Sequence, residues 1–271
     1  METKLFALFI GRSGSGKSAA AASLPKPLEE LDFDLRANGI RNCIEQGWLN
    51  GADIHFTEFD PFKGYMQIEN YLNIKYSLIA VKQFGLKSID IGSLHSLLRL
   101  LDLTSLNAPS STGDKHLNIA GLAMTGPGDY KFEASALRKI IDYLRIFPCN
   151  VVLTTHIVDK YGKAPGADKY ASSTVIGEKL VITANLGEEV LGMFNDTYRF
   201  SKEIINNEAH YFVEFNTEIA KNSFGIPPGR FDITCIEFWP FFQKLVESIK
   251  DGSFKRPTAK QQQQNGGVLA F

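Results

Sequence analysis

The sequence predicts an α/β domain whose central sheet is mostly parallel and flanked by helices. The first observation is an apolar run at residues 5–10, which leads into a glycine-rich loop and then a helix-forming segment. The second is the alternation of short apolar segments with amphipathic ones, which indicates strands joined by helices. The third is Val-Val-Leu-Thr-Thr at residues 151–155, typical of a strand buried on both faces. In such a sheet a ligand binds at the carboxyl ends of the strands.

The loop at residues 11–18 reads Gly-Arg-Ser-Gly-Ser-Gly-Lys-Ser, the complete spacing of a phosphate-binding loop. Its glycines permit unusual backbone torsions and let N–H groups approach a phosphate. We expect Lys17 to reach the β- and γ-phosphates and the Ser18 hydroxyl to bind Mg²⁺. The alternative is a glycine-rich turn that matches by chance, which the flanking strand and helix disfavour. The expected nucleotide-binding residues are Gly11, Ser13, Gly14, Ser15, Gly16, Lys17 and Ser18.

The segments after this loop continue the alternation of strand and helix. Pro25 ends the first helix, and residues 28–35 are a short, partly apolar strand that ends in acidic residues. Residues 36–64 are mixed and contain glycines, but the alternation at 53–59 predicts a strand within them. Apolar residues at helical spacing predict a helix at 65–83.

The middle of the chain predicts a strand and two helices. Residues 86–94 are a strand that runs into a turn, and a helix follows from 94 to about 103. Residues 107–130 are rich in turn-forming residues, so we expect an exposed loop with a short element at 117–124. Residues 131–146 form an amphipathic helix.

The last third of the chain is expected to close the sheet. A strand at 151–156 precedes a polar loop at 159–174, which we expect to be mobile, and short elements at 175–199. Residues 194–200 and 210–215 alternate like the two strands of an antiparallel pair.

One domain and a tail are the expected organisation. Aromatic-rich residues 231–250 complete the fold, so the domain is expected to span residues 1–250. Residues 251–271 contain four consecutive glutamines and a glycine pair, a low-complexity composition that predicts disorder. This tail could be a partner-binding peptide, or it could be inert.

Composition narrows the class of protein. With 271 residues, 44% hydrophobic and 22% charged, the chain can form a sizeable core. A net charge of −1 gives no global signal for nucleic acid, so DNA binding would need a local patch or a ring of subunits. Three scattered cysteines form no metal-binding or disulfide pattern, which fits a reducing compartment. The apolar run at 5–10 is too short for a membrane span, so we expect a cytoplasmic protein without membrane contact.

The site also needs an acid for the metal ion and a group that orients the attacking water. Asp90 is the expected Mg²⁺ acid, although Lys87 and Ser88 make its strand only partly apolar. An alternative register places Gly92 where that acid should be and puts Asp90 two residues early, on the same side of the strand. An aspartate on a surface strand is the structural alternative. At the end of the second strand Asp34 is the expected water-orienting group.

Other acids and a histidine at the ends of the strands are also candidate site residues. Asp32 is a less favoured alternative to Asp34, Glu58 is weaker still, and each could simply be a solvated acid. His156 follows the strand at 151–155, so it is expected beside the γ-phosphate, which it could sense and signal to the loop at 159–174. A packed, structural histidine is the alternative. The remaining histidines lack this context: His55, His95, His116 and His210.

Two cations could act on a neighbouring subunit. Lys221 and Arg230 flank the segment Gly-Ile-Pro-Pro-Gly at 225–229. A cation on such a loop could reach the γ-phosphate of an adjacent subunit, as an arginine finger does. A solvated charge is the alternative for both residues.

With these residues in place, the chain resembles the RecA-like P-loop ATPases encoded by phages. That group includes Sak-type single-strand-annealing recombinases and related phage nucleotide-binding proteins. It shares an acid at the end of the second strand, a metal-binding acidic strand, a strand that ends in His, and a Phe-Asp segment before a closing hairpin. The matching segments are 11–18, 25–28 leading to 31–34, 86–97, 144–148 with 150–156, and 193–199.

The resemblance implies a RecA-like core, ATP binding, Mg²⁺-dependent hydrolysis and a homo-oligomer that shares nucleotide sites. It also implies action on single-stranded DNA in recombination or replication, in the cytoplasm of a phage-infected bacterial cell. The tail could then bind other replication or recombination proteins. The catalytic set it implies is Lys17, Asp34, Asp90 and His156. One departure concerns the metal, because in a gapless match Gly92 falls on the aspartate of the family.

Two other functions compete with a DNA-linked ATPase. The first is a nucleotide-binding assembly or interaction protein with little turnover, which the partly apolar strand at 86–94 favours. The second is a small-molecule kinase. Such kinases usually have an arginine-rich lid, whereas residues 159–174 contain three lysines and no arginine, which disfavours this class.

Overall fold

The computed structural model describes most of the chain. The described residues are 4–33, 35, 38–60, 63–80, 84–107, 117–119, 122–124, 127–163, 173–182, 186–217, 219–254 and 268–269.

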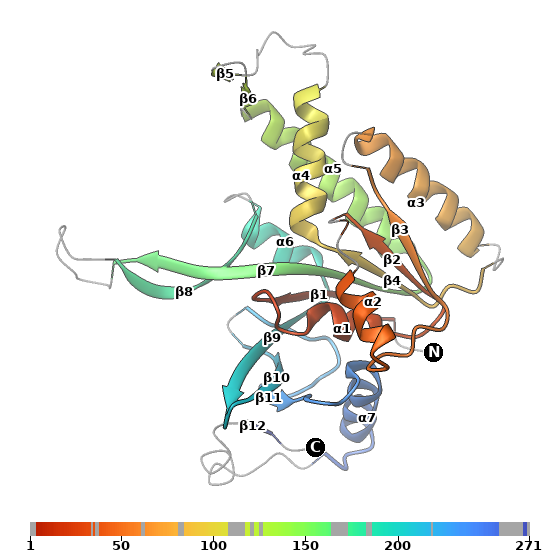
Figure 1. Ribbon diagram of the computed structural model, residues 1–271, viewed down its shortest axis with the longest axis vertical. Helices are drawn as coiled ribbons and strands as arrows, with labels where there is room; N and C mark the ends of the chain where they lie inside the picture. Colours follow the sequence, from red (N-terminus) through yellow and green to blue (C-terminus); the bar gives the residue numbers. More distant parts are fainter. Residues whose placement is uncertain are drawn as a thin grey trace.

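One large sheet organises the fold (Figure 1). Its strand order is β12-β11-β10-β9-β1-β7-β4-β2-β3, with β8 paired to β7 outside this path. The strands from β9 to β3 in this order are parallel, whereas β10 and β11 continue it in antiparallel fashion. The strands are β1 (Phe6–Gly11), β2 (Leu28–Asp32), β3 (Ile54–Glu58), β4 (Ser88–Gly92), β7 (Asn150–Gly162), β8 (Thr174–Leu180), β9 (Asp196–Ile205), β10 (Glu208–Phe215), β11 (Gly229–Asp232) and β12 (Val268–Leu269).

Helices cover both faces of the sheet, as Figure 1 shows. One face carries α1 (Lys17–Ala22), α2 (Asn38–Glu45) and α7 (Phe238–Lys250), and the other carries α3 (Tyr65–Ala80), α4 (Leu94–Asn107), α5 (Pro127–Ile146) and α6 (Gly187–Met193). A mostly parallel sheet between two helical layers, closed by an antiparallel hairpin, confirms the predicted α/β architecture.

Alternate residues of β1 pack into two separate hydrophobic cores. Phe6, Leu8 and Ile10 pack with α3, α4, α5 and α6, while the residues between them pack with α1 and α7. Every residue of β1 is buried. This explains why residues 5–10 are apolar without alternation, since a central parallel strand has no solvated face.

Aromatic side chains fill the core beneath α7. The ring of Phe9 lies 4.9 Å from that of Phe200, 5.2 Å from Phe238 and 5.8 Å from Tyr198, measured between centroids. Such tilted and edge-to-face pairs add to the burial of the rings themselves. The cluster therefore fixes the carboxyl-terminal helix against the strand that precedes the glycine-rich loop.

The region expected to be a polar loop is partly strand. β7 continues from the predicted strand to Gly162 and pairs with β8 from residue 174. We call this projecting hairpin the β7–β8 arm; Figure 1 shows it extending beyond the sheet. Its middle, residues 164–172, lies outside the described residues.

Two helices also differ from expectation. Helix α2 was not predicted in the mixed region after the second strand. Helix α5 begins at Pro127 rather than at 131, because proline suits the first turn of a helix, where its missing N–H costs no bond. The predicted short element at 117–124 is a two-stranded hairpin of β5 (Leu117–Ile119) and β6 (Leu122–Met124).

Little of the predicted tail belongs to the described residues. Phe254 packs against the core beneath α7, and β12 pairs with Arg230 and Phe231 of β11. Residues 255–267 lie outside the described residues, so the division into a domain and a disordered, partner-binding tail stays a prediction. Among the described helices, none has the length and apolar character needed to cross a bilayer.

Replacing Phe9 with alanine should strongly destabilise the fold, because it removes the ring shared by β1, β9 and α7. We expect a loss of about 3–5 kcal/mol in the free energy of unfolding, measured by urea denaturation. Phe84→Ala is the control, since Phe84 is 55% exposed and should cost less than about 1 kcal/mol. Equal costs for the two substitutions would contradict the described core.

Candidate functional site

The glycine-rich loop follows directly from the end of β1. The strand ends at Gly11, where a Cβ would collide with the carbonyl oxygen of Phe200 on β9. The chain then turns through Gly14 and Gly16, whose φ angles of 72° and 89° lie in the left-handed region that glycine adopts freely. Helix α1 begins at Lys17. The predicted order of strand, loop and helix is therefore what the chain adopts.

The loop's own carbonyl groups hold the side chain of Lys17. Its Nζ donates hydrogen bonds to the oxygens of Gly11 and Arg12, both at 2.9 Å, and lies 3.4 Å from Oγ of Ser15. Burial lowers the pKa of Lys17 to about 8, because water no longer stabilises the charged form. The loop thus fixes a cation among backbone groups, an arrangement suited to an anion.

The outer side of the loop is open. Ser13, Gly14 and Ser18 are exposed, so the Ser18 hydroxyl is accessible to a ligand or a metal ion. Gly16 lies against the ring of Tyr211 on β10, where a Cβ would stand 3.3 Å from the ring. The loop therefore exposes the residues Ser13, Gly14 and Ser18, while the Lys17 side chain is bound by the loop's own carbonyl groups.

His156 lies beside this loop. In the parallel register of β1 and β7, Gly11 pairs with His156. Side chains alternate along a strand, and Val152 belongs to the core on the α1 side, so His156 also faces α1. The residue is half-buried, and pairing with β8 starts at the next position. Its role as a sensor stays a prediction.

Asp90 faces α1 as well, but it lies deep in the sheet. It pairs with Val152, four residues before His156. Burial raises the pKa of Asp90 to about 6, while its contact with Glu30 acts in the opposite direction. The end of β4 belongs to Gly92, two residues or roughly 7 Å further along. The metal-binding role of Asp90 stays a prediction.

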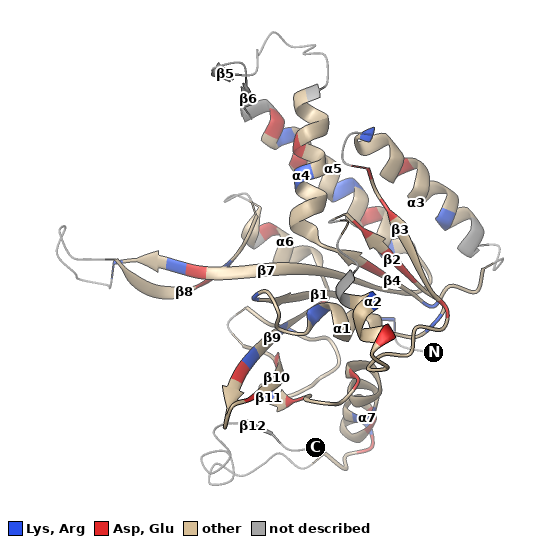
Figure 2. Ribbon diagram, in the orientation of Figure 1, with Lys and Arg blue, Asp and Glu red and all other residues tan. Residues whose placement is uncertain are grey.

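Glu30 is a candidate that the sequence reasoning missed. It is 4% exposed, lies in the middle of β2 and pairs with Asp90. One of its carboxylate oxygens lies 2.7 Å from the point at which a Cβ of Gly92 would stand. Figure 2 shows the acidic residues on β2 and the neighbouring strands. A signal was available, because Glu30 and Asp32 are two apart and therefore share a face of the strand.

Two of the three acids considered for orienting water belong to the described residues, namely Asp32 and Glu58. Asp34 lies outside the described residues. Asp32 ends β2, is 3% exposed and pairs with Gly92. Glu58 is exposed on the edge strand β3 and forms an ion pair of 3.1 Å with Arg41, which fits a surface role.

The two predicted trans-acting cations have contacts within their own chain. Arg230 lies 2.7 Å from a carboxylate oxygen of Glu203, and its guanidinium stands 3.7 Å from the ring centre of Phe212. Lys221 pairs through its backbone with Thr197 on β9. A role toward a neighbouring subunit stays a prediction for both.

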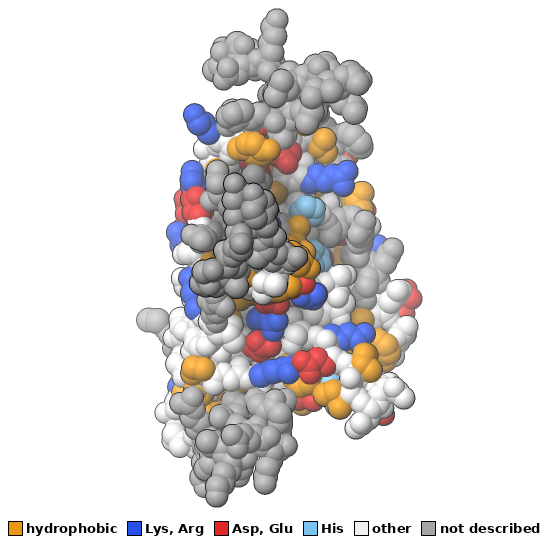
Figure 3. All heavy atoms as spheres, turned by 90° about the vertical axis from the view of Figure 1, so that its left-hand side faces the viewer, with side chains coloured by type: hydrophobic (Ala, Val, Ile, Leu, Met, Phe, Trp, Pro, Cys, Tyr) orange, Lys and Arg blue, Asp and Glu red, His pale blue; other side chains and the backbone are white. Residues whose placement is uncertain are grey.

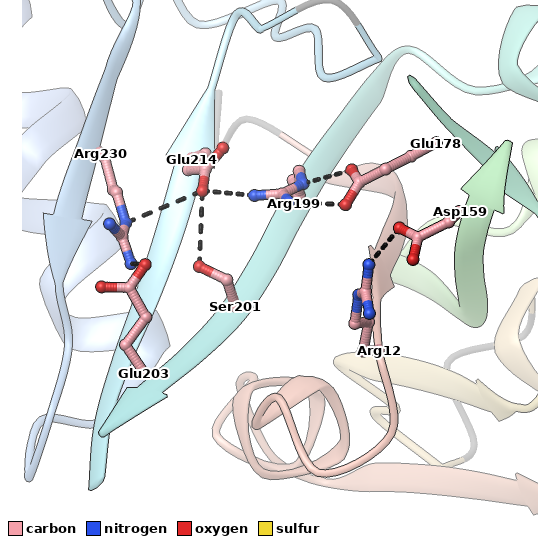
Figure 4. A network of polar contacts seen from close by, with 8 residues as sticks. All are labelled: Arg12, Asp159, Glu178, Arg199, Ser201, Glu203, Glu214 and Arg230. Atoms are coloured by element: carbon pink, nitrogen blue, oxygen red, sulfur yellow. Dashed lines mark hydrogen bonds and ion pairs between the residues drawn. The ribbon is translucent and has the colours of Figure 1, made fainter. Parts of the chain in front are cut away.

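Ion pairs tie the β7–β8 arm to the loop and the sheet (Figure 4). Arg12, the second residue of the loop, pairs with Asp159 on β7. Arg199 on β9 makes two bonds of 2.8 and 2.7 Å to Glu178 on β8, and a third of 2.6 Å to Glu214 on β10. The bidentate contact between Arg199 and Glu178 has a defined geometry and fixes the base of the arm relative to β9. The ion pair between Arg12 and Asp159 joins the arm to the loop.

The chemistry of the site fits Mg²⁺ that arrives with a nucleotide. Among the described residues, no group of three or more His, Cys, Asp or Glu side chains could hold a metal ion. Mg²⁺ usually binds through one or two carboxylates, phosphate oxygens and water rather than an all-protein cage. The accessible Ser18 hydroxyl and the buried acids on the α1 face are residues of the kind that could contribute to such a smaller set.

Comparison with known proteins assigns no family. No protein-family profile and no curated protein matches the chain. Among solved structures, a KaiC-like protein from the hyperthermophilic archaeon Pyrococcus horikoshii is similar, with 16% sequence identity, a TM-score of 0.41 and 83% of each chain covered. This likeness is too distant to carry an argument about function, which therefore rests on the site itself.

Affinity for ATP should fall as pH rises from 7 to 9, because Lys17 loses its proton through a pKa of about 8. The cation that attracts phosphate is present below that pKa and lost above it, so we expect a decline of roughly tenfold. Isothermal titration at several pH values measures it. Lys17→Arg keeps its charge throughout and should bind more weakly but without the decline. The same decline in both proteins would assign the titration to another group.

Proposed function

We propose that this protein binds ATP with Mg²⁺ and hydrolyses it, as a RecA-like ATPase that acts on or with single-stranded DNA in phage recombination or replication. The observation that supports it best is the Lys17 ammonium, held by the carbonyls of Gly11 and Arg12 at 2.9 Å beneath an open glycine-rich loop. A buried cation within an exposed glycine-rich loop suits a polyphosphate rather than a neutral ligand. The corresponding location is the cytoplasm of an infected bacterial cell.

Each residue has a role in this proposal. Lys17 and the loop amides bind the β- and γ-phosphates, and the Ser18 hydroxyl binds Mg²⁺. An acid at the end of β2, Asp34 or the neighbouring Asp32, orients the attacking water. His156 senses the γ-phosphate and passes the nucleotide state to the β7–β8 arm, whose pairing begins at the next residue.

The β7–β8 arm supports assembly into a homo-oligomer. It exposes four large apolar side chains, namely Val158 (42%), Tyr161 (64%), Val175 (54%) and Ile176 (46%). Apolar side chains gathered on a projecting element favour contact with another protein. Because the arm begins beside the phosphate-binding loop, such a contact would lie close to the nucleotide.

The DNA part of the proposal has the least support from surface charge. On the face seen in Figure 3, basic side chains are interspersed with acidic and hydrophobic ones. The net charge of the chain is −1. A DNA-binding surface would therefore combine basic residues from several subunits, since affinity for phosphates depends on clustered positive charge.

Lys17→Ala should abolish ATP hydrolysis, with kcat/KM at least about a hundredfold lower, because the γ-phosphate loses its cation in the transition state. A steady-state ATPase assay with and without single-stranded DNA measures this, and sizing with and without ATP tests assembly. Lys244→Ala is the control, because that lysine is exposed on α7 and should leave the rate unchanged. Unaltered turnover in Lys17→Ala would contradict the proposal.

A second function is a nucleotide-binding assembly protein with little turnover. The observation that favours it is Gly92, which leaves the end of β4 without a side chain where a metal-binding acid is expected. The same assays separate the two functions. Saturable ATP binding without turnover, whether or not DNA is added, favours the assembly protein, and DNA-stimulated turnover favours the ATPase.

A further inference from the structure

The site lacks a carboxylate on β4 at the position nearest the loop. That strand ends at Gly92, and its acid, Asp90, lies two residues deeper. A metal ion held by Ser18 and a nucleotide phosphate needs a negative charge near the ends of the strands, because Mg²⁺ in such sites binds one or two carboxylates.

Glu30 places a carboxylate at this position from the neighbouring strand. It starts level with Asp90, yet one of its oxygens lies 2.7 Å from where a Cβ of Gly92 would stand. Its side chain therefore runs two residues toward the carboxyl end of the sheet. In an aspartate, the Cβ lies at a similar distance from the carboxylate oxygens of the same side chain. The Glu30 oxygen therefore occupies the space that the carboxylate of an aspartate at 92 would fill.

The surroundings of the two carboxyl groups also call for a cation. Asp90 is 1% exposed; its carboxyl contacts that of Glu30 and the backbone of Ile91, and neither of its oxygens makes a well-formed hydrogen bond among the described residues. Ionised carboxylates only accept hydrogen bonds, so two in contact need a shared proton or a positive ion between or beside them. A divalent ion near the loop satisfies that need.

We propose that Glu30 supplies the carboxylate that holds the Mg²⁺ of the bound nucleotide, and that residue 92 is glycine because Glu30 needs its space. This inference rests on the proposed binding of ATP with Mg²⁺. It moves the metal-binding acid from β4 to β2, with Asp90 beneath it as the buried partner that positions the Glu30 carboxyl.

The test is the factor by which Mg²⁺ tightens ATP binding, measured as the ratio of the dissociation constants in EDTA and in Mg²⁺. The wild-type chain should show a ratio of about ten or more, worth about 1.4 kcal/mol. Glu30→Gln keeps the shape of the side chain and should bring the ratio close to one, while affinity in EDTA stays at the wild-type value and shows that the fold is intact.

A matched control changes the adjacent residue in the same way. Glu29 faces the other side of β2, where it accepts hydrogen bonds from Thr57 and Tyr71 and pairs with Lys75. Glu29→Gln should lower the melting temperature but leave the Mg²⁺ ratio at the wild-type value. An equal loss of the ratio in both variants would overturn the assignment to Glu30.

Moving the carboxylate from residue 30 to residue 92 separates loss of the metal-binding group from loss of stability of the fold. Gly92→Asp alone should not raise the Mg²⁺ ratio, because the new side chain collides with Glu30. The double variant Glu30→Ala with Gly92→Asp should recover at least half of the wild-type ratio on a logarithmic scale. Failure of this recovery, together with a normal ratio in Glu30→Gln, would overturn the inference.

Two further outcomes are decisive. Loss of the Mg²⁺ ratio in Asp90→Asn but not in Glu30→Gln would return the role to Asp90 and overturn the inference while ATP binding stands. A wild-type chain that binds no ATP in either EDTA or Mg²⁺ would overturn the proposed function itself, and the inference with it.

Discussion

The site depends on how the ammonium group of Lys17 is held. Two carbonyl oxygens at 2.9 Å fix it at the end of β1, and this requires the chain to fold back through Gly14 and Gly16 in left-handed conformations. Gly11 must also lack a side chain, since β9 passes too closely for a Cβ. The loop is therefore constrained on both sides, by its own lysine and by the sheet. A loop that is ordered in this way before a ligand binds would lose little conformational entropy on binding.

The order of the strands determines which other residues reach this loop. β7 lies between β1 and β4, so His156 is next to Gly11, while the acids of β4 and β2 are one and two strands further away, respectively. The β7–β8 arm begins at the same place and is joined to the loop through Arg12 and Asp159. The glycine-rich loop, His156 and the base of the arm therefore lie together at the carboxyl end of the sheet.

Structural features that depend on residues close together in the sequence could be predicted from it. The loop and the strands flanking it follow from local apolar runs and glycine spacing, and the structure has them at the expected positions. The extent of β7 could not be predicted, because the acids Asp159 and Glu178 are neutralised by arginines remote in sequence. Glu30 was missed for a similar reason. Its spacing from Asp32 reveals only that the two residues share a face of β2, whereas its place beside Gly92 depends on the lateral register of β2 and β4.

The central claim is that the loop after β1 recognises the terminal phosphates of a nucleoside triphosphate. Equilibrium titration of the intact chain with ATP and with AMP tests it most directly, because the two ligands share the base, the sugar and one phosphate. We expect one ATP bound per chain and an affinity for AMP weaker by about a hundredfold or more, since AMP lacks the groups that Lys17 would contact. Equal affinities, or no saturable binding of ATP, would contradict it.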